Sequence, residues 1–350
     1  MTAAFLELKS RRDAILAAEP RLRARDLAAK LGISEAELVA LGRDDAKATR
    51  LRPEWFSIIE EVSSLGHVMA LTRNESCVHE RKGVYGKLGG NAHVALIVGD
   101  DIDLRIFLSH WRFGFGVVES TEHGERRSLQ FFDGAGEAIH KVYLTDQSDV
   151  AAYDRLVAKW ANDEPRAPLA VEAAPAREDA LPDSEIDVPG FHAAWDALKD
   201  THEFHGLLNK FKVQRVQGLR LAGMSRAMPV DALTLRRVFE NAAARETPIM
   251  VFVGNPGMIQ IHTGPVSNLK PMGPWFNVLD EKFNLHLRED HVASAWIVWK
   301  PTDDGMVTSL ELFDAEGEAI ATLFGKRKPG QPEDKAWRAI VVDAIEKVAA

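Results

Sequence analysis

Alternating apolar and polar residues along the chain predict the strands of an antiparallel sheet. The strand evidence is strongest in Asp103–Leu108 (DLRIFL), which alternates, and in Ala295–Lys300 (AWIVWK), which is almost wholly apolar. Three more segments favour strands and are bounded by Gly or Asp: Ser128–Phe132, Ala138–Leu144 and Ser309–Phe313. Turn-forming pairs such as Asp133-Gly134 recur about every ten residues, which favours hairpins over long crossovers. With amphipathic segments before and after these strands, the pattern predicts an α+β fold with helices on one side of an antiparallel sheet.

The strand-rich part of the chain occurs twice. Ser128–Leu144 (SLQFFDGAGEAIHKVYL) and Ser309–Gly325 (SLELFDAEGEAIATLFG) are identical at eight of seventeen positions, at an offset of 181 residues. The same offset pairs Asn74 with Asn255. A constant offset over such a length indicates a duplicated unit. We therefore predict two homologous halves in tandem, each with two helices, several strands and a closing helix.

A segment of unusual composition separates the halves, which we place at residues 1–160 and 191–350. Residues 161–190 contain five prolines, seven alanines and eight acidic residues against two arginines. Such a stretch has too little apolar surface to offset the entropy lost on ordering. We predict that it is a linker.

Composition narrows the function classes. The 350 residues carry 43 Lys and Arg against 52 Asp and Glu, a net charge of −9, which argues against a protein that grips nucleic acid or an anionic membrane. The single cysteine, Cys77, forms no intrachain disulfide. The charged N-terminal stretch has no apolar core of a signal peptide, and no apolar run approaches the roughly 20 residues of a membrane span. These features predict a cytoplasmic protein that is not embedded in a membrane.

Residues Arg25–Leu41 have the outline of a helix-turn-helix, with two short amphipathic helices around Gly32. In a DNA-binding motif the second helix lies in the major groove. Here that helix begins with Glu35 and Glu37, which would face phosphates. The segment therefore favours a packing helix pair over a nucleic-acid reader.

The segment Lys199–Lys212 (KDTHEFHGLLNKFK) carries the most informative histidines. Asp200 followed by Glu203 resembles a capping box, so a helix is expected to begin near Thr201. Its apolar stripe consists of Phe204, Leu207, Leu208 and Phe211. His202 and His205 point away from that stripe. They are either solvated surface residues or metal ligands. The first turn of a helix favours a neutral imidazole, which suits a ligand of iron. A zinc ion bound by both histidines is the other alternative, but no Cys or carboxylate cluster completes a set of four ligands.

A second unusual feature is the strand Asp103–Leu108. Its apolar residues alternate with Arg105 and Phe107, which share the other face. An arginine beside an aromatic ring fits either a flat anionic ligand or an ordinary polar outer face. Three more cations stand in the C-terminal half, at Arg215, Lys300 and Arg327.

No Gly-rich phosphate loop, HExxH, CxxC or GxSxG motif is present. The chain also lacks the Cys-x-x-Cys-His motif that attaches heme covalently. Any heme b (iron protoporphyrin IX) is therefore expected to bind non-covalently.

Several phrases of the chain resemble the bacterial cytoplasmic hemin-degrading factors and hemin transport proteins of heme-uptake operons. The resemblance covers nearly the whole chain, including the duplication and the linker. It is carried by Met69–Asn74 (MALTRN), Val78–Gly83 (VHERKG), Asp103–Phe113 (DLRIFLSHWRF), Ser128–Leu144, Asp200–Leu208 and Gly325–Glu333 (GKRKPGQPE).

The resemblance implies that heme lies in a cleft between a helix of the C-terminal half and the sheet of the N-terminal half. It places the axial ligand at His202 and a distal arginine at Arg105, with Phe107 as its aromatic neighbour. In some members a second histidine, at the position of His205, is an alternative ligand. Around the propionates and the macrocycle the resemblance places Arg215, Phe252, Lys300 and Arg327.

The chain departs from the family pattern at one position. Several members have a tyrosine where Phe324 stands, so a hydrogen bond from that phenol is missing here. The offset of 181 places Arg21 opposite His202, which predicts one high-affinity heme per chain. His67 and His79 fit either a weaker second site or ordinary surface and core roles.

Three functions remain open. In the first, Arg105 helps to polarise an iron-bound peroxide, and the heme ring is opened oxidatively with electrons from an external reductase or ascorbate. In the second, the protein carries heme from an inner-membrane importer to a separate heme oxygenase, and His202 and His205 exchange as ligands. The third is a heme-free binding module or regulator, which only the helix-turn-helix outline supports.

Overall fold

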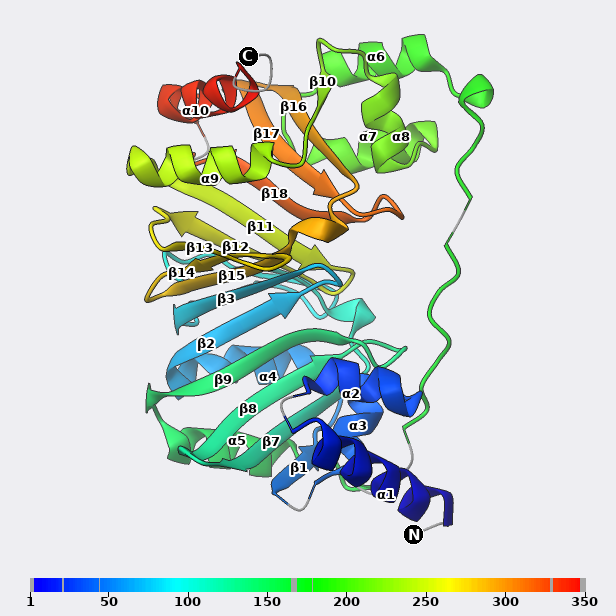
Figure 1. Cartoon of the computed structure of the whole chain (residues 1–350), viewed down its shortest axis with the longest axis vertical. Helices are drawn as coiled ribbons and strands as arrows, with labels where there is room; N and C mark the ends of the chain where they lie inside the picture. Colours follow the sequence, from blue (N-terminus) through cyan, green and yellow to red (C-terminus); the bar gives the residue numbers. More distant parts are fainter. Residues whose placement is uncertain are drawn as a thin grey trace. The chain divides into compact units, whose positions relative to one another are not determined.

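The computed structural model describes residues 3–20, 22–43, 45–164, 169–177, 179–327 and 330–346 (Figure 1). The chain divides into two compact units that nearly follow the two halves. Unit 1 consists of Met1–Arg73, Arg81–Pro175 and Asn255–Ile259, and unit 2 of Asn74–Glu80, Ala176–Gly254 and Gln260–Ala350. Each unit thus includes a short segment from the opposite half of the sequence. The two exchanged segments begin at Asn74 and Asn255, which the repeat offset relates.

The two halves of the sequence have the same order of elements. The first half contains α1 (Ala3–Ala18), α2 (Ala24–Leu31), α3 (Glu35–Leu41), β1 (Ala46–Arg50), α4 (Trp55–Glu61), β2 (Gly66–Arg73), β3 (Cys77–Val84), β4 (Leu88–Gly90), β5 (Val94–Ile97), β6 (Asp103–Phe107), β7 (Phe113–Thr121), β8 (Gly124–Phe132), β9 (Ala138–Ser148) and α5 (Val150–Trp160). The second half contains α6 (Val188–Asp196), α7 (Glu203–Phe211), α8 (Arg215–Leu221), β10 (Ala227–Val230), α9 (Thr234–Ala244), β11 (Ile249–Asn255), β12 (Met258–Gly264), β13 (Leu269–Met272), β14 (Trp275–Leu279), β15 (Phe283–Arg288), β16 (Ser294–Thr302), β17 (Gly305–Phe313), β18 (Ala319–Gly325) and α10 (Lys335–Glu346).

The strands form two large antiparallel sheets, which confirms the α+β prediction. In unit 1, neighbouring strands run in the order β1-β7-β8-β9-β2, and β4-β5-β6 form a second run. In unit 2, the corresponding orders are β10-β16-β17-β18-β11 and β13-β14-β15. The hairpin predicted from Asp133-Gly134 is present as the β8–β9 turn, and its counterpart in the second half, Glu316-Gly317, lies in the β17–β18 turn. The prediction omitted α4 and α9, each of which follows the first strand of its half.

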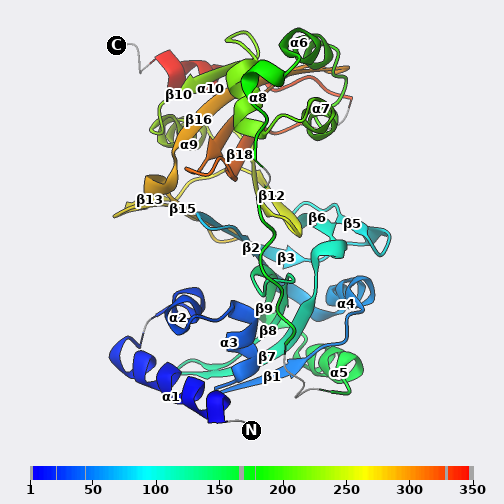
Figure 2. The same ribbon diagram turned by 90° about the vertical axis from the view of Figure 1, so that its right-hand side faces the viewer.

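Helices cover both faces of the sheet in unit 1, so the expectation of a single covered face is wrong (Figure 2). On one face, Ala36 of α3 packs against Phe113 and Phe115 of β7. On the other face, glycines of β7 let α4 and α5 approach closely. A Cβ atom at Gly116 would lie 2.5 Å from Val157, so only glycine fits beneath α5.

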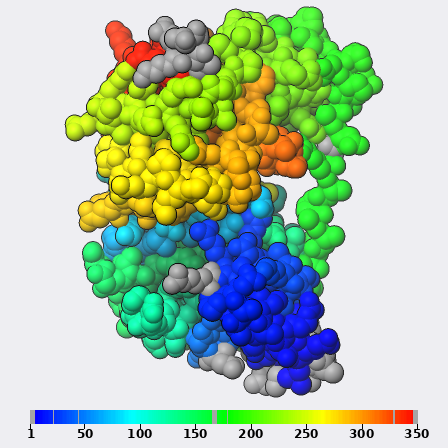
Figure 3. Space-filling model, in the orientation of Figure 1, coloured from blue at the N-terminus to red at the C-terminus, as the bar shows by residue number. Residues whose placement is uncertain are grey.

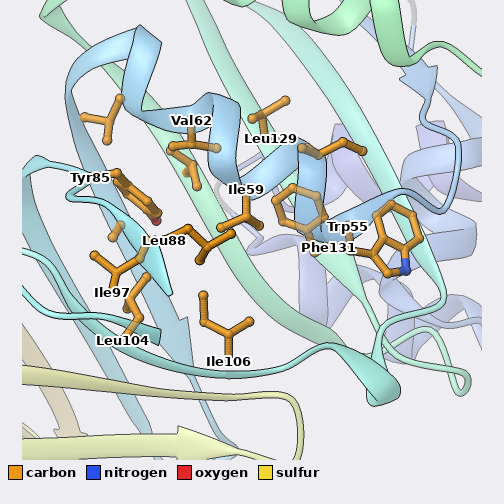
Figure 4. Close-up of a cluster of buried hydrophobic side chains, with 14 of the residues drawn as sticks. Trp55, Ile59, Val62, Tyr85, Leu88, Ile97, Leu104, Ile106, Leu129 and Phe131 are labelled. Atoms are coloured by element: carbon orange, nitrogen blue, oxygen red, sulfur yellow. The ribbon is translucent and has the colours of Figure 1, made fainter. Parts of the chain in front are cut away.

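The core on the α4 and α5 side of unit 1 is built from large side chains of helix and sheet (Figure 4). Trp55 and Ile59 of α4 lie against Leu129 and Phe131 of β8. Strands β5 and β6 complete the cluster with Ile97, Leu104 and Ile106, all buried. This core holds β6, and hence Arg105, in place.

Unit 2 also packs helices on both faces of its sheet. Phe239 of α9 and Trp337 of α10 join the core on the side of Ile297. On the opposite side, Trp296 and Val298 of β16 pack beneath α6, α7 and α8. That second layer positions the helix that carries His202.

The linker makes specific contacts. Before α6, its described residues form no helix or strand other than a short 3-10 turn, Asp183–Glu185, and its last residues, 188–190, already belong to α6. Leu169 and Val171 pack against the core of unit 1, whereas Leu181 and Ile186 pack in unit 2. Residues 172–177 and 179–180, which lie between these contacts, form no helix or strand and belong to the green segment of Figure 3. Two of the five linker prolines, Pro165 and Pro168, lie outside the described residues.

In the part of the chain that the structure describes, no helix is both long and apolar enough to cross a membrane.

Candidate functional site

Helix α7 begins at Glu203, two residues later than the sequence predicts, and its start has side-chain hydrogen bonds. The carboxylate of Glu203 accepts the backbone N–H groups of Lys199 and Asp200, at 2.9 and 3.3 Å. Asp200 Oδ1 in turn accepts the backbone N–H of His202 at 2.9 Å. These bonds stabilise the turn that precedes α7. They also fix the backbone on which His202 stands.

The imidazole of His202 is solvent-exposed, with 86% of its side chain accessible. Its Nδ1 lies 2.6 Å from Asp200 Oδ1. An ionised carboxylate accepts but does not donate, so Nδ1 carries a proton; in the neutral ring Nε2 then has the lone pair. The backbone N–H of His202, its ring and the charge of Arg327 lower the pKa of the Asp200 carboxyl. Asp200 is therefore ionised at neutral pH, as this tautomer requires.

His205 is also exposed and lies one turn further along α7. Its Nε2 is 3.1 Å from the side-chain amide nitrogen of Asn209. Of the predicted stripe of α7, Phe204, Leu207 and Leu208 are buried and Phe211 is half-buried. Both histidines lie outside the stripe. The two imidazoles are thus presented outward but engaged through different ring nitrogens.

Behind α7, Arg215 and Lys300 share one buried carboxylate. Arg215 donates to Glu311 Oε2 from Nε and Nη2, at 2.9 and 2.8 Å, while Lys300 Nζ is 2.5 Å from Oε1. Both cations also lie over the ring of Phe204, at 5.2 and 4.5 Å from its centroid. We call Arg215, Lys300 and Glu311 the charge triad; it carries a net charge of +1.

The environment of the triad differs between its members. Burial raises the pKa of the Glu311 carboxyl, but Arg215 and Lys300 outweigh it and lower this pKa to about 2. Lys300 is 3% exposed, because α6–α8 cover the face of β16 that it shares with Trp296. Arg215 is 33% exposed, so it is the member of the triad that solvent or a ligand reaches. The same cover buries Trp296, whose ring therefore belongs to the core and lines no open wall.

Sequence reasoning missed Glu311. A signal was available, because Glu311 stands between Leu310 and Leu312 on a strand with apolar neighbours, as Arg105 does on β6. Its partner Arg215 is 96 residues away in the sequence, so the pairing itself is a tertiary feature.

The other candidates of unit 2 lie on or next to β11 and β18. Phe252 packs edge-on against Phe324, with ring centroids 5.1 Å apart, and both side chains are half-buried. Phe324 therefore fills the place of the family tyrosine with an apolar contact. Arg327 Nη2 is 3.8 Å from Asp304 Oδ2. Its neighbour Lys328 lies outside the described residues.

In unit 1, Arg105 and Phe107 lie on β6 and are half-buried. Arg105 forms an ion pair with Asp103 and donates from Nη1 to the carbonyl of Leu104 at 3.1 Å. About a third of its side chain, 34%, is exposed. The guanidinium is thus restrained from one side and open to solvent on another.

An exposed apolar surface adjoins Arg105 and Phe107 in unit 1. Leu96 pairs with Arg105 and Val94 with Phe107 between β5 and β6. Val94, Leu96 and Val98 are 50%, 38% and 64% exposed. The sequence does not reveal this surface. The buried residues Ala95 and Ile97 alternate with exposed residues that are also apolar, so no polar residue marks the exposed face.

The surroundings of His67 and His79 favour structural roles over a weaker second heme site. His79 is fully buried in unit 2, with Nδ1 2.8 Å from the side-chain amide of Gln260 and its ring 5.0 Å from Phe283. His67 is half-buried, with Nδ1 3.0 Å from the hydroxyl of Thr145. These are core and part-buried structural roles. Arg21, the counterpart of His202, lies outside the described residues.

The helix-turn-helix outline corresponds to α2 and α3. Ser34 and Glu37 form a capping box at the start of α3. Glu35 is buried and forms an ion pair with Lys141 of β9. The start of α3 is therefore packed on the sheet, as the packing interpretation requires. Among the described residues, no group of three or more His, Cys, Asp or Glu is arranged to hold a metal ion.

Comparison with known proteins finds the same duplication. The model of the haemin-degrading HemS.ChuX domain matches the chain twice, at residues 32–160 and 212–343. Hemin transport protein HmuS of Yersinia pestis is 41% identical over 342 residues, which is 95% of each chain.

Two solved structures are similar over nearly the whole length. Holo-PhuS, described as a heme-binding protein from Pseudomonas aeruginosa, is 50% identical with a TM-score of 0.93, covering 96% of this chain and 98% of that one. ChuS, described as a heme oxygenase of E. coli, is 38% identical with a TM-score of 0.84, covering 94% and 98%.

Proposed function

The chain belongs to the haemin-degrading HemS.ChuX domain family, and from that premise we propose that it binds heme b non-covalently in heme uptake and iron acquisition. We place it in the cytoplasm, with an inner-membrane heme importer as the donor. The observation that carries the proposal is the exposed imidazole of His202, projecting from a helix whose other face is core. A nitrogen ligand presented in this way is what heme iron requires.

Other candidate residues meet what heme binding requires besides an iron ligand, namely cations for the propionates and apolar contacts for the macrocycle. Arg215 of the charge triad is accessible and carries the net positive charge that suits a propionate. Arg327 is a second cation of the same unit, near Asp200. We assign the rings of Phe252 and Phe107, with the aliphatic surface beside Phe107, to apolar contacts with the macrocycle. Lys300 contributes indirectly, because its ammonium is held by Glu311.

We propose further that the bound heme is a substrate whose ring is opened oxidatively. In this function we assign His202 to the iron, and the exposed guanidinium of Arg105 to hydrogen bonds with the oxygen that reacts with the ring. Electrons come from an external reductant. The relative ChuS, described as a heme oxygenase, supports this order of preference.

A second function, a non-catalytic carrier, is favoured by one specific observation. His205 stands three residues from His202 on the same helix, and both side chains are exposed. Two adjacent ligands allow one iron bond to form as the other breaks, which lowers the barrier to handing heme to a separate heme oxygenase.

One assay separates the two functions. The purified protein is loaded with hemin, supplied with ascorbate or with NADPH and a reductase, and kept free of peroxide with catalase. Loss of the Soret band with release of iron and a linear tetrapyrrole supports ring opening. A band that persists and then moves to an added heme oxygenase supports the carrier.

The ligand assignment is tested by His202→Ala. This substitution is expected to weaken hemin affinity at least about tenfold, or about 1.4 kcal/mol, and to change the ferric spectrum, because the iron loses its imidazole. His123→Ala, which removes an imidazole that is 89% exposed in unit 1, is the matched control. Wild-type affinity and spectrum in His202→Ala would place the ligand elsewhere.

The role of Arg105 is tested by Arg105→Ala. We expect hemin turnover to fall more than hemin affinity, because the guanidinium acts on the oxygen side and not on the iron–histidine bond. Arg126→Ala, which removes a 54% exposed arginine of the same unit, controls for loss of charge. Equal losses of affinity and turnover would instead make Arg105 a binding residue only.

A further inference from the structure

His202 and His205 are both exposed on α7, so exposure alone does not decide which of them binds iron first. The difference lies in the ring nitrogen that each histidine has available. An imidazole binds iron through a nitrogen that carries no proton and accepts no other hydrogen bond. The partners of the two rings therefore determine their order as ligands.

Asp200 prepares His202 for binding. The carboxylate lies 2.6 Å from Nδ1 and also accepts the backbone N–H of the same residue, so it is held in place by two bonds. In the neutral ring this geometry places the proton on Nδ1 and the lone pair on Nε2. An ionised carboxylate behind the ring also makes Nε2 a stronger donor to a metal.

Asn209 has the opposite effect on His205. Its side-chain amide lies 3.1 Å from Nε2, one helical turn away. The amide nitrogen donates to Nε2, which occupies the lone pair of that nitrogen. The proton of His205 is then on Nδ1, the other ring nitrogen. His205 must break its bond to Asn209 before Nε2 is available.

We propose that Asp200 and Asn209 are positioning residues that rank the two histidines: Asp200 makes His202 the first iron ligand, and Asn209 holds His205 in reserve. This ranking rests on the proposed heme binding and adds the residues that control it. Neither Asp200 nor Asn209 touches the iron. Both are exposed, so their substitution tests the ranking without removing core.

The first test reads the tautomer in the apoprotein, without heme. In ¹⁵N-labelled protein, long-range ¹H–¹⁵N spectra identify the protonated nitrogen, and the His202 signals are those absent from His202→Ala. We expect Nδ1–H in the wild type and in Asp200→Asn, whose carbonyl still accepts. In Asp200→Ala the proton should move to Nε2. An unchanged tautomer in Asp200→Ala would overturn the role of Asp200.

The second test measures hemin affinity and the ferric spectrum. Asp200→Ala should weaken binding about tenfold, at the lower end of the effect of removing a partner from a metal-bound histidine. Asp196→Ala removes another exposed carboxylate of unit 2, one that pairs with Arg226, and should leave affinity unchanged. Equal affinities for Asp200→Ala and the wild type, with the helix intact by circular dichroism, would contradict the proposal.

The third test concerns the reserve ligand. In a His202→Ala background, Asn209→Ala should raise hemin affinity several-fold, because it releases Nε2 of His205. In the wild-type background the same substitution should change affinity little. No gain in the double variant would overturn the role of Asn209.

These outcomes are separable from a failure of the proposed function. If the wild type does not bind hemin, or if His202→Ala binds as the wild type does, the proposed function fails. The tautomers in the apoprotein are still measured independently of that result.

Discussion

Glu311 is a single buried carboxylate that holds two cations of different exposure. It accepts from Lys300 and Ser309 through Oε1 and from Arg215 through Oε2. Because Lys300 is fully covered, its charge is tolerable only while Glu311 is ionised. Arg215 Nη1 makes no hydrogen bond to any described residue, so this nitrogen is available to a ligand. Glu311 therefore stabilises unit 2 and also fixes the orientation of the Arg215 guanidinium.

Replacing Glu311 by Gln should lower the free energy of unfolding of unit 2 by about 3–5 kcal/mol at pH 7, because Lys300 is left buried without a counter-charge. The folded pKa of about 2 lies below the ordinary value of 4.5, so the unfolded chain takes up this proton first as the pH falls. The stabilisation is present above about pH 4.5 and is lost as the pH falls toward 2. Urea unfolding at pH 7 and pH 4, followed by fluorescence, measures both effects.

Glu316→Gln provides the control for Glu311→Gln, because Glu316 is exposed in the β17–β18 turn. It should change stability by less than about 0.5 kcal/mol. If Glu311→Gln were as stable as Glu316→Gln, the charge triad would not be a stabilising feature.

The placement of a single side chain could be predicted from the sequence where it depends on residues nearby in the chain. The outward placement of His202 and His205 followed from the apolar stripe of one helix, and the structure confirms their exposure. The burial of Lys300 depends on helices that are distant in sequence, so alternation on β16 alone did not indicate it. The same limit hid Glu311.

Helix α7 presents its histidines beside a position without a side chain. Gly206 lies one turn after His202 on the same side of the helix, is exposed, and has no atom within 4 Å of the place where a Cβ would stand. A glycine inside a helix costs about 0.5–1 kcal/mol relative to alanine. The gap next to His202 leaves space in which a flat ligand can lie over the helix.

We therefore expect two different effects at Gly206. Gly206→Ala should raise stability by about 0.5–1 kcal/mol in thermal or urea unfolding, because α7 gains a better helix former. Gly206→Leu should lower hemin affinity, because its side chain fills the space beside His202, while the fold remains stable. Glu240→Leu, which puts a leucine on the exposed side of α9, is the control for added apolar surface. Unchanged hemin affinity in Gly206→Leu would argue that the ligand does not lie along this turn.

Elements with a clear period were predictable, and elements whose role depends on both sheet faces were not. The five strands inferred from alternation or strand preference are all present, and their hairpin turns lie at the expected Gly positions. The extra helices α4 and α9 were missed. The sequence also did not indicate that helices cover the second face of the sheet. A glycine such as Gly116 is compatible with close helix packing and with a turn, so the sequence alone does not distinguish the two.

At the scale of the whole molecule, the two units have separate cores but are not simply the two halves of the sequence. Unit 1 contains Asn255–Ile259 and unit 2 contains Asn74–Glu80. In unit 1, Asn255 donates to the carbonyls of Arg73 and Ile139, at 2.9 and 2.8 Å. In unit 2, Asn74 donates to the carbonyls of Gly254 and Ile320, at 3.1 and 2.9 Å. Self-comparison revealed the repeat, but these exchanged segments depend on contacts between residues 116 to 246 positions apart in the sequence.

Because each unit has its own core, ligand binding to one unit should stabilise that unit first. With free hemin at 100 times the dissociation constant, binding through His202 should add about 2.7 kcal/mol to the stability of unit 2. Pulse proteolysis in urea, with the surviving peptides identified by mass spectrometry, assigns the gain to peptides of α7, α8 and β16–β18. His202→Ala should lose most of this gain, whereas His123→Ala should retain it. A gain of equal size in His202→Ala would mean that hemin stabilises the protein through contacts other than the proposed iron ligand.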